Sequence, residues 1–463
     1  MQVTLYGAAN EVTGSCYLLE TKESRILIDC GLFQGPERLK KFNRIPANIF
    51  SRRLDAVILT HGHLDHCGRL PLLVRAGYNG PIYTTQGSIE ISRLVLSDAA
   101  RIQHEDTERE NRHRHQNGLK PISALFDQSD VERVCTLYRA IDYGEKTAIS
   151  KDVNIQLVEA GHILGSASAI IEVSNSEEKK RIVFSGDLGP WNAPIMRDPA
   201  VIEDADIVFM ESTYGDRDHK TLDDTLLEFE NAIRHAILNK GKILIPTFAV
   251  GRTQQLLYHL AEMFRKGVFE PFPIYLDSPM AIAATELYRK HPELMDEEAR
   301  ALEMSGQLRK DLASLRLCPA SEDSRALNSV EGPCLILAGA GMCNAGRILH
   351  HLRHNLANAE NVVIIVGYQV KGSTGRHLVE GAETVKILGE TIHVRAAVRA
   401  LGGFSAHAGQ SDLLRWLEPM ARKHAHVILT HGEANPINEL YHKVEERFSL
   451  KAERPKLGNT LSF

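Results

Sequence analysis

The segment His61-Gly62-His63-Leu64-Asp65-His66 holds three imidazoles and one carboxylate within six consecutive residues. Imidazole nitrogens and carboxylate oxygens are groups that zinc accepts as ligands in proteins. His61 and His63 are two residues apart, so an extended loop can direct both toward one ion, while Asp65 and His66 face a second ion. Burying so many polar groups without a partner costs free energy. The segment therefore predicts a two-zinc hydrolase, with the ions about 3.5–4 Å apart.

Three residues further along the chain are candidates to complete this site. Asp187 follows Ser185-Gly186 and offers a carboxylate able to bridge two ions, whereas His162 would complete the first ion and His431 the second. A lone histidine is more often an ordinary core or surface residue, so these assignments depend on the first motif. The same ligand types also suit manganese and iron, and the sequence leaves that choice open.

Strand-like segments end just before most of these candidates. Such segments are Leu54 to Thr60, Ile155 to Glu159, Arg181 to Phe184, Ile207 to Met210 and His426 to Thr430. Strands that end at one sheet edge bring ligands together from distant parts of the sequence. We therefore expect the site to lie at the edge of a sheet.

From about Thr221 the sequence alternates between strand-like and long helix-like segments, which predicts a parallel α/β module. Examples are a helix over 222–238, a strand over 242–246 and a helix over 252–264. After about Arg399 short elements return, so the module is expected to be an insertion into the first domain. The predicted domains are 1–208, 209–396 and 397–463, with the last segment returning to the first domain.

The bulk composition excludes some classes of protein. The 463 residues carry a net charge of −5, so any phosphate contacts must come from a local cleft and not from a strongly basic surface. The seven cysteines form no C-x-x-C pair, which argues against a disulfide framework or a cysteine zinc knuckle. No long apolar run or secretion signal is evident, so we expect no membrane association and a cytoplasmic location. Oligomeric state, including a homodimer, stays open.

With these motifs the chain resembles the metallo-β-lactamase fold hydrolases, and within them the β-CASP nucleases related to the endonuclease that cleaves pre-mRNA at its 3′ end. Asp29 matches the early aspartate of that fold, and His61 to His66, His162 and Asp187 match its later motifs. The fifth histidine of classical members is absent at its usual place, where a long insertion begins. The resemblance implies an α/β fold: a metallo-β-lactamase αββα sandwich with an inserted parallel α/β β-CASP domain.

The three additional β-CASP motifs are also matched. Glu211 matches the acidic motif, His407 in Phe404-Ser405-Ala406-His407 the second, and His431 the last, which in the family supplies the missing zinc ligand. Intact motifs argue against an inactive scaffold subunit. The resemblance implies two zinc ions per chain, an RNA substrate and a metal-dependent ribonuclease.

The implied mechanism is attack on phosphorus by a metal-bound hydroxide, with His407 as the general acid. Glu211 would orient His407 and stabilise its protonated ring. Asp65 would bind the second ion and orient the nucleophile, and Asp29 would brace the metal loop from behind.

Glycine-rich segments of the insertion suggest contacts with substrate phosphates through backbone amides and arginine. The candidate substrate-binding residues are Arg252, Arg347, Ser373, Thr374, Arg376 and Ser405. The alternative is that these segments are only βα turns with capping roles.

Competing functions remain at this point. The leading hypothesis is endonucleolytic cleavage of RNA, and the alternatives are a 5′-exonuclease, a DNA-directed nuclease or a hydrolase of a small ester. An RNA-binding or scaffolding protein with structural zinc is a further alternative, which the intact Glu211 and His407 disfavour.

Overall fold

The computed structural model describes residues 1–463 except 36, 175–178, 368, 370–371 and 451. The polar segment over 175–180 also predicts a turn, and most of it lies outside the described residues. The chain forms two compact units: unit 1 comprises Met1–Asp218 with His407–Phe463, and unit 2 comprises His219–Ala406.

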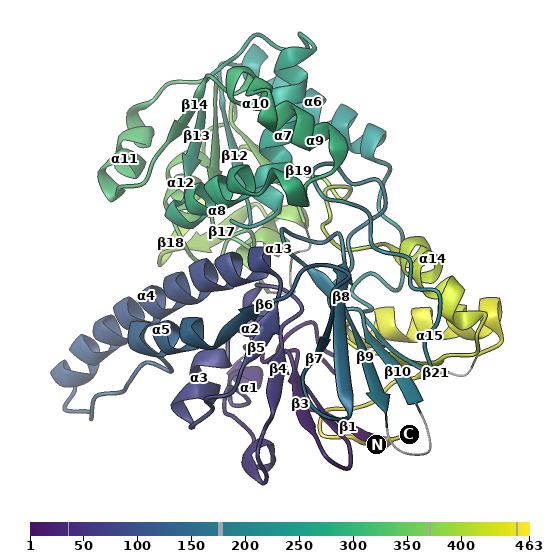
Figure 1. Cartoon of the computed structure of the whole chain (residues 1–463). Helices are drawn as coiled ribbons and strands as arrows, with labels where there is room; N and C mark the ends of the chain where they lie inside the picture. The colour runs from purple at the N-terminus through teal and green to yellow at the C-terminus, as the bar shows by residue number, and fades with distance from the viewer. Residues whose placement is uncertain (36, 175–178, 368, 370–371, 451) are drawn as a thin grey trace. The chain divides into compact units, whose positions relative to one another are not determined.

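Unit 1 contains two seven-stranded sheets (Figure 1). The first runs β22 (Thr460–Ser462), β1 (Gln2–Leu5), β2 (Tyr17–Glu20), β3 (Arg25–Ile28), β4 (Ala56–Ile58), β5 (Ile82–Thr84) and β6 (Tyr138–Ala140). The second runs β21 (Ala452–Glu453), β20 (His426–Leu429), β11 (Ile207–Met210), β10 (Lys179–Phe184), β9 (Ala167–Ser174), β8 (Val153–Glu159) and β7 (Lys146–Ala148). Strands from both ends of the chain thus join one unit.

The two sheets of unit 1 pack face to face. One hydrophobic core joins them and includes Leu19 and Ile28 from the first sheet and Ile171 and Phe209 from the second. Strand β8 alternates strictly between buried and half-buried residues, as a strand with one face on this core should.

Helices cover the outer faces of both sheets. Those of unit 1 are α1 (Glu37–Lys40), η1 (Ala47–Phe50), α2 (Leu64–Cys67), α3 (Leu70–Arg75), α4 (Gln86–Gln116), α5 (Gln128–Leu137), α14 (Gln410–Ala421) and α15 (Ala434–Phe448). Trp416 and Leu417 of α14 and Leu440 of α15 form a second core with Val208 and Val427 of the second sheet. These layers form an αββα sandwich.

Unit 2 is a parallel α/β module. Its six-stranded sheet runs β14 (Leu315–Leu317), β13 (Ile274–Asp277), β15 (Cys334–Ala338), β12 (Lys242–Pro246), β16 (Val362–Ile365) and β19 (Ala397–Ala400), and all of these pairs are parallel. A separate antiparallel pair joins β17 (Thr384–Ile387) and β18 (Glu390–His393). Ile243 and Ile245 of β12 enter one core and Leu244 the other, so both faces of the sheet are covered.

The helices of unit 2 connect these strands. They are α6 (Leu222–Leu238), α7 (Arg252–Arg265), α8 (Pro279–Lys290), η2 (Pro292–Leu294), α9 (Glu297–Met304), α10 (Gln307–Asp311), α11 (Ser321–Ala326), η3 (Leu327–Ser329), α12 (Ile348–Asn355) and α13 (Thr374–Val379). In the described parts of both units, no helix is long and apolar enough to cross a membrane.

Unit 2 begins at residue 219, and the chain returns to unit 1 at residue 407. The sequence predicted these two boundaries at 209 and 397, which is 10 residues too early in each case relative to the compact units. Hydrogen bonding accounts for the offset. Strand β11 ends at Met210 and pairs with β20 in unit 1, whereas β19 begins at Ala397 and pairs with β16 in unit 2. The division into domains at 208/209 and 396/397 stays a prediction.

Candidate metal centre

The candidate metal ligands and the acidic residue Glu211 follow the ends of strands in both sheets of unit 1. The placements are His61 and His63 after β4, Asp65 and His66 in α2, His162 after β8, Asp187 after β10, Glu211 after β11 and His431 after β20. The structure therefore brings together at one place residues that are up to 370 positions apart in the sequence (61 to 431).

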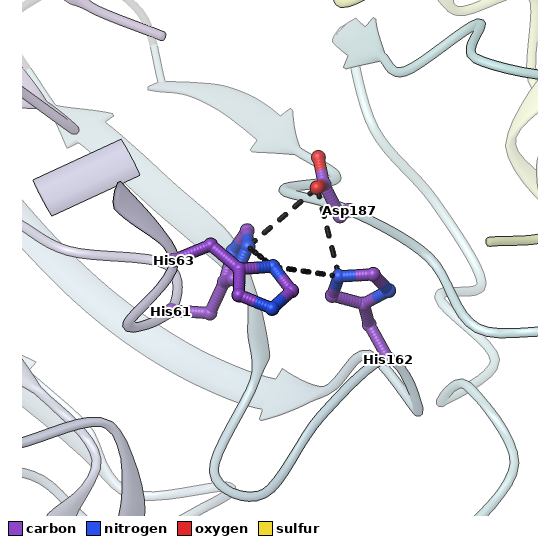
Figure 2. A group of neighbouring side chains, drawn as sticks. All are labelled: His61, His63, His162 and Asp187. Carbon is purple, nitrogen blue, oxygen red and sulfur yellow. Dashed lines mark hydrogen bonds and ion pairs between the residues drawn. The ribbon is translucent and has the colours of Figure 1, made fainter. Parts of the chain in front are cut away.

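A first group consists of His61, His63, His162 and Asp187, whose side chains point toward one another (Figure 2). Nδ1 of His63 lies 3.2 Å from Nε2 of His61 and 3.1 Å from Nε2 of His162. Oδ2 of Asp187 lies 3.5 Å from Nε2 of His61 and 3.7 Å from Nε2 of His162.

A second group consists of Asp65, His66 and His431. Nε2 of His431 lies 3.2 Å from Nε2 of His66 and 3.5 Å from Oδ2 of Asp65. Oδ1 of Asp187 lies 3.2 Å from Nε2 of His66, so the carboxylate that turns Oδ2 to the first group turns Oδ1 to the second. Asp187 thus lies between the two groups.

The spacing of these atoms fits divalent metal ions. Two ligand atoms each about 2.1 Å from a tetrahedral zinc ion lie about 3.4 Å apart, which is close to the spacing observed in both groups. Oδ1 of Asp187 is buried and accepts no hydrogen bond from any described residue, so its lone pairs remain available. Buried nitrogen and oxygen donors that converge in this way suit a metal ion better than they suit one another.

Protonation also favours metal binding in the first group. Burial lowers the pKa of His61 well below its usual value and that of His63 to about 4, so both rings are neutral near pH 7. Burial raises the pKa of Asp187, but the neighbouring His431, His66 and His61 outweigh this and hold it well below the usual value. Neutral imidazoles and an ionised carboxylate are the forms that bind a cation.

Behind the ligands, Asp29 and Thr60 hold two histidine rings. Oδ2 of Asp29 lies 2.7 Å from Nδ1 of His66, and the hydroxyl of Thr60 lies 3.2 Å from Nδ1 of His61. The Thr60 backbone N–H donates to Oδ1 of Asp29 at 2.8 Å. Ring nitrogens held in this way leave the opposite nitrogens directed at the metal position. The sequence predicted this supporting role for Asp29, whereas Thr60 was predicted only as the last residue of a strand.

The backbone is strained at two of these positions. Asp29 has φ +56° and His431 has φ +48°, both in the left-handed region that side chains rarely adopt. The His431 amide donates to the Ala8 carbonyl at 2.8 Å, and the His431 carbonyl accepts from the Ser212 amide at 3.1 Å. These bonds fix a backbone conformation that no local sequence signal reveals.

The loop that carries His162 is clamped by α4. The hydroxyls of Thr85 and Ser88 donate to the Gly165 carbonyl at 2.6 and 2.7 Å. Gly165 has φ +79°, and a Cβ there would come within 2.4 Å of the Ser88 nitrogen, so only glycine fits. Ser166 accepts hydrogen bonds from the His162 and Ile163 amides. No sequence pattern predicted this clamp.

Glu211 and His407 form a third group with Asp187. Nδ1 of His407 lies 3.3 Å from Oε1 of Glu211 and 4.0 Å from Oδ2 of Asp187. Burial lowers the pKa of His407, but the Glu211 carboxylate outweighs it and raises the pKa to about 9. The Glu211 side chain is fully buried, whereas 23% of the His407 side chain is exposed. A buried acid therefore holds a ring that still reaches the surface of unit 1.

The six candidate substrate-binding residues all lie in unit 2, in loops or helix starts that follow the carboxyl ends of parallel strands. That edge is where α/β sheets generally bind ligands. Arg347 donates to Oδ1 of the buried Asp277 (2.7 Å) and to the carbonyls of Cys318 and Pro319 (2.7 and 2.8 Å). Its guanidinium is thus engaged within the fold, which supports the structural alternative for this residue.

The other five differ in what they contact. Ser373 is buried and caps α13 by accepting from the Arg376 amide at 3.1 Å, while Arg376 pairs with Glu380 at 2.7 Å with 42% of its side chain exposed. The Thr374 amide donates to Asn344 at 3.2 Å. Arg252, at the start of α7, and Ser405 are both buried. Arg376 is therefore the most accessible cation of the set.

Three family models match the chain. The model of the metallo-beta-lactamase superfamily matches residues 9–131, the Beta-Casp domain residues 253–378, and the Zn-dependent metallo-hydrolase RNA specificity domain residues 391–453.

Curated relatives match nearly the whole chain. It is 40% identical over 434 residues to a protein named Ribonuclease TTHA0252 from Thermus thermophilus, covering 94% of this chain and 93% of that one. It is 32% identical over 450 residues to one named Transcription termination factor FttA from Methanocaldococcus jannaschii, covering 94% of this chain and 67% of that one. A crystal structure of a protein of unknown function from Enterococcus faecalis shares the fold, with a TM-score of 0.55 at 14% identity and 99% coverage of both chains.

An αββα sandwich with histidines and aspartates gathered at the ends of its strands defines a metallo-β-lactamase fold hydrolase, and the fold class predicted from the sequence is confirmed. The chain belongs to the β-CASP family within that superfamily. The family implies divalent metal ions, and each of the two ligand groups has the residue types and spacing to hold one such ion.

Proposed function

We propose that the chain is a two-zinc ribonuclease that cleaves RNA at internal phosphodiester bonds. The observation that carries the proposal is the position of Asp187, which turns Oδ2 to one group of histidines and Oδ1 to another and lies beside the Glu211–His407 pair. The relatives named ribonuclease and transcription termination factor, and the match to an RNA specificity domain, support RNA as the substrate and a metal-dependent ribonuclease as the enzyme class.

His61, His63, His162 and Asp187 would hold one zinc ion, and Asp65, His66, His431 and Asp187 the other. When bound, the two ions supply Lewis acidity that activates water and neutralises charge on the phosphate. Asp29 and Thr60 keep His66 and His61 in the orientation that binding requires.

His407 is proposed as the general acid that protonates the leaving oxygen. Because Nδ1 of His407 faces Glu211, Nε2 is the ring atom that would transfer the proton. Glu211 fixes this tautomer and stabilises the protonated ring, while its Oε1 is itself held by the Leu188 amide at 2.7 Å. Asp65 would orient the attacking water by accepting a hydrogen bond from it.

In unit 2, we propose that Arg376, Thr374, Ser373, Ser405 and Arg252 contribute to RNA binding at the carboxyl edge of the sheet. The enzyme is proposed to act in the cytoplasm, in keeping with seven cysteines that are all free thiols. Gel filtration would test the homodimer that the sequence leaves open.

The test is cleavage of a structured RNA labelled at its 5′ end by zinc-loaded protein. Internal cuts that His407→Ala abolishes support the proposal, and His104→Ala, an exposed histidine on α4, is the matched control. Release of mononucleotides from one end would instead establish an exonuclease, and cleavage of DNA alone a DNA-directed nuclease. A zinc-replete protein that cuts no nucleic acid would refute the nuclease.

A further inference from the structure

A pocket of about 260 Å³ lies on unit 1, apart from the candidate metal centre. It is formed by α14, labelled in Figure 1, and by the connection from β10 to β11. The residues that give it its chemistry are Trp191, Val201, Arg415, Trp416, Glu418 and Arg422. None of them has a part in the mechanism above.

Both tryptophans of the chain line this pocket. The Arg415 guanidinium lies 3.9 Å from the centre of the Trp191 ring, and the Trp416 side chain is almost fully buried. An arginine stacked on an indole is a flat cationic platform, which favours a flat ligand that carries negative charge.

The charge around the pocket favours an anionic ligand. The Glu418 carboxylate forms two ion pairs, with Arg422 at 2.5 Å and with Arg447 at 2.7 Å. Among the residues that line the pocket, two arginines, Arg415 and Arg422, thus face one carboxylate, and Arg422 is 74% exposed at the rim. A negatively charged group with a flat ring matches this combination of aromatic surface and excess positive charge.

We propose that this pocket binds one nucleotide of single-stranded RNA, with its base against the Trp191–Arg415 stack and its phosphate near Arg422. The proposal rests on the proposed function, because a ribonuclease substrate supplies such nucleotides. Pockets for drug-sized ligands measure about 300–1,000 Å³, so this smaller one accommodates a single nucleotide. Stacking on aromatic and guanidinium groups is how proteins hold unpaired bases, whereas bases inside a duplex are not available for it. Because the pocket lies apart from the candidate metal centre, it would hold a part of the strand that is not being cut.

Tryptophan fluorescence reports on this pocket alone because the chain has no other tryptophan. Zinc-loaded protein is titrated with a phosphorothioate oligoadenylate, which resists cleavage, and in a second arm with adenosine 5′-monophosphate. We expect saturable quenching by both probes, with the oligonucleotide binding at least about tenfold more tightly because neighbouring phosphates add contacts. No quenching by either probe would refute the pocket. Equal affinity for the two probes would assign it to a free nucleotide and overturn the assignment to an RNA strand.

Two variants make the result specific to the pocket. Arg415→Gln removes the stacked cation, and Val201→Glu adds a negative charge at a rim position that is 58% exposed. Each should weaken oligonucleotide binding about tenfold, the effect of losing one stacking contact. Arg53→Gln, on an arginine side chain that is 88% exposed, makes the same change in net charge and should have no effect. Equal effects of all three variants would refute the pocket.

The nuclease proposal is tested separately in the same preparation by cleavage of labelled RNA. Cleavage without any change in fluorescence would refute the pocket and leave the nuclease standing, whereas quenching without cleavage would do the reverse.

Discussion

Oε1 of Glu211 lies 3.3 Å from Nδ1 of His407, and the same oxygen accepts the Leu188 amide hydrogen at 2.7 Å. Leu188 directly follows Asp187, so one carboxylate ties the proposed proton donor to the backbone of the proposed bridging ligand. This arrangement fixes where the His407 proton resides without placing Glu211 among the metal ligands.

Glu211→Gln should lower kcat for RNA cleavage by about 10²–10⁴-fold, because the amide no longer stabilises a protonated His407 ring. Metal content should stay at the wild-type value. Single-turnover rates across pH 5–9 together with metal analysis check this, and Glu23→Gln at an exposed turn is the control. Loss of zinc together with activity would mean that Glu211 serves the metal site instead.

Asp187→Asn should lower the metal content from about two ions per chain to one or fewer, because a neutral amide cannot neutralise two cations at once. Activity should disappear, and the rise in Tm that zinc gives the wild-type protein should shrink. Metal analysis after dialysis and thermal unfolding with and without a chelator measure both effects. Two ions retained at wild-type affinity would overturn the bridging role.

Thr60→Val tests a residue that no sequence pattern singled out. The substitution keeps the shape and the backbone N–H bond to Asp29, but it removes the hydroxyl that contacts His61 and Asp29. We expect metal affinity to fall about 10- to 100-fold, the usual effect of losing a group that orients a ligand. Competition with a zinc chelator measures it, with Thr136→Val at an exposed position of α5 as the control. Unchanged affinity would show that metal binding does not depend on the contact between the Thr60 hydroxyl and His61.

Much of the fold could be predicted because its elements have strong local signals. Helix α6 and strands β11 and β12 have the predicted bounds, since long periodic or continuous apolar segments define them. Residues 279–326 were not predicted: α8 to α11 are short, and their burial depends on the sheet they cover. The pairing of β22 with β1 was also missed, because the paired residues Thr4 and Thr460 are 456 positions apart in the sequence.

The site shows the same division. The candidate metal ligands within His61 to His66 were predicted because such a dense histidine and aspartate motif is improbable without a function, and the predictions of His162, Asp187 and His431 depended on that motif. Thr60, Thr85 and Ser88 were not predicted, because threonine and serine are common and act here through partners distant in sequence. For Arg347, the sequence left a phosphate contact and a structural role open, and the pairing of its guanidinium with Asp277 favours the structural role.

Arg347→Gln should therefore affect mainly stability, and Arg376→Gln mainly RNA binding. The first leaves the fully buried Asp277 without its guanidinium and should lower the free energy of unfolding by about 3 kcal/mol. The second removes only an exposed ion pair, so stability should change by less than about 1 kcal/mol while RNA binding weakens. Urea unfolding and RNA binding by a catalytically silent His407→Ala background separate the two. Weaker RNA binding by a stably folded Arg347→Gln protein would restore its predicted role.

Glu159 should make stability fall between about pH 5 and 7. Burial raises the pKa of this carboxyl to about 7 despite the hydrogen bond from the Gly161 amide. The folded protein therefore keeps the proton up to about pH 7, whereas the unfolded chain loses it near pH 4.3, and a group whose pKa rises on folding stabilises the folded state less as pH increases. The difference amounts to about 4 kcal/mol at 1.36 kcal/mol per pKa unit. Glu159→Gln keeps the acceptor for the Gly161 amide but cannot titrate. The Tm of this variant minus the Tm of the wild-type protein should therefore increase from pH 5 to pH 7. Parallel Tm curves for the two proteins across that interval would show that Glu159 is already ionised in the folded state.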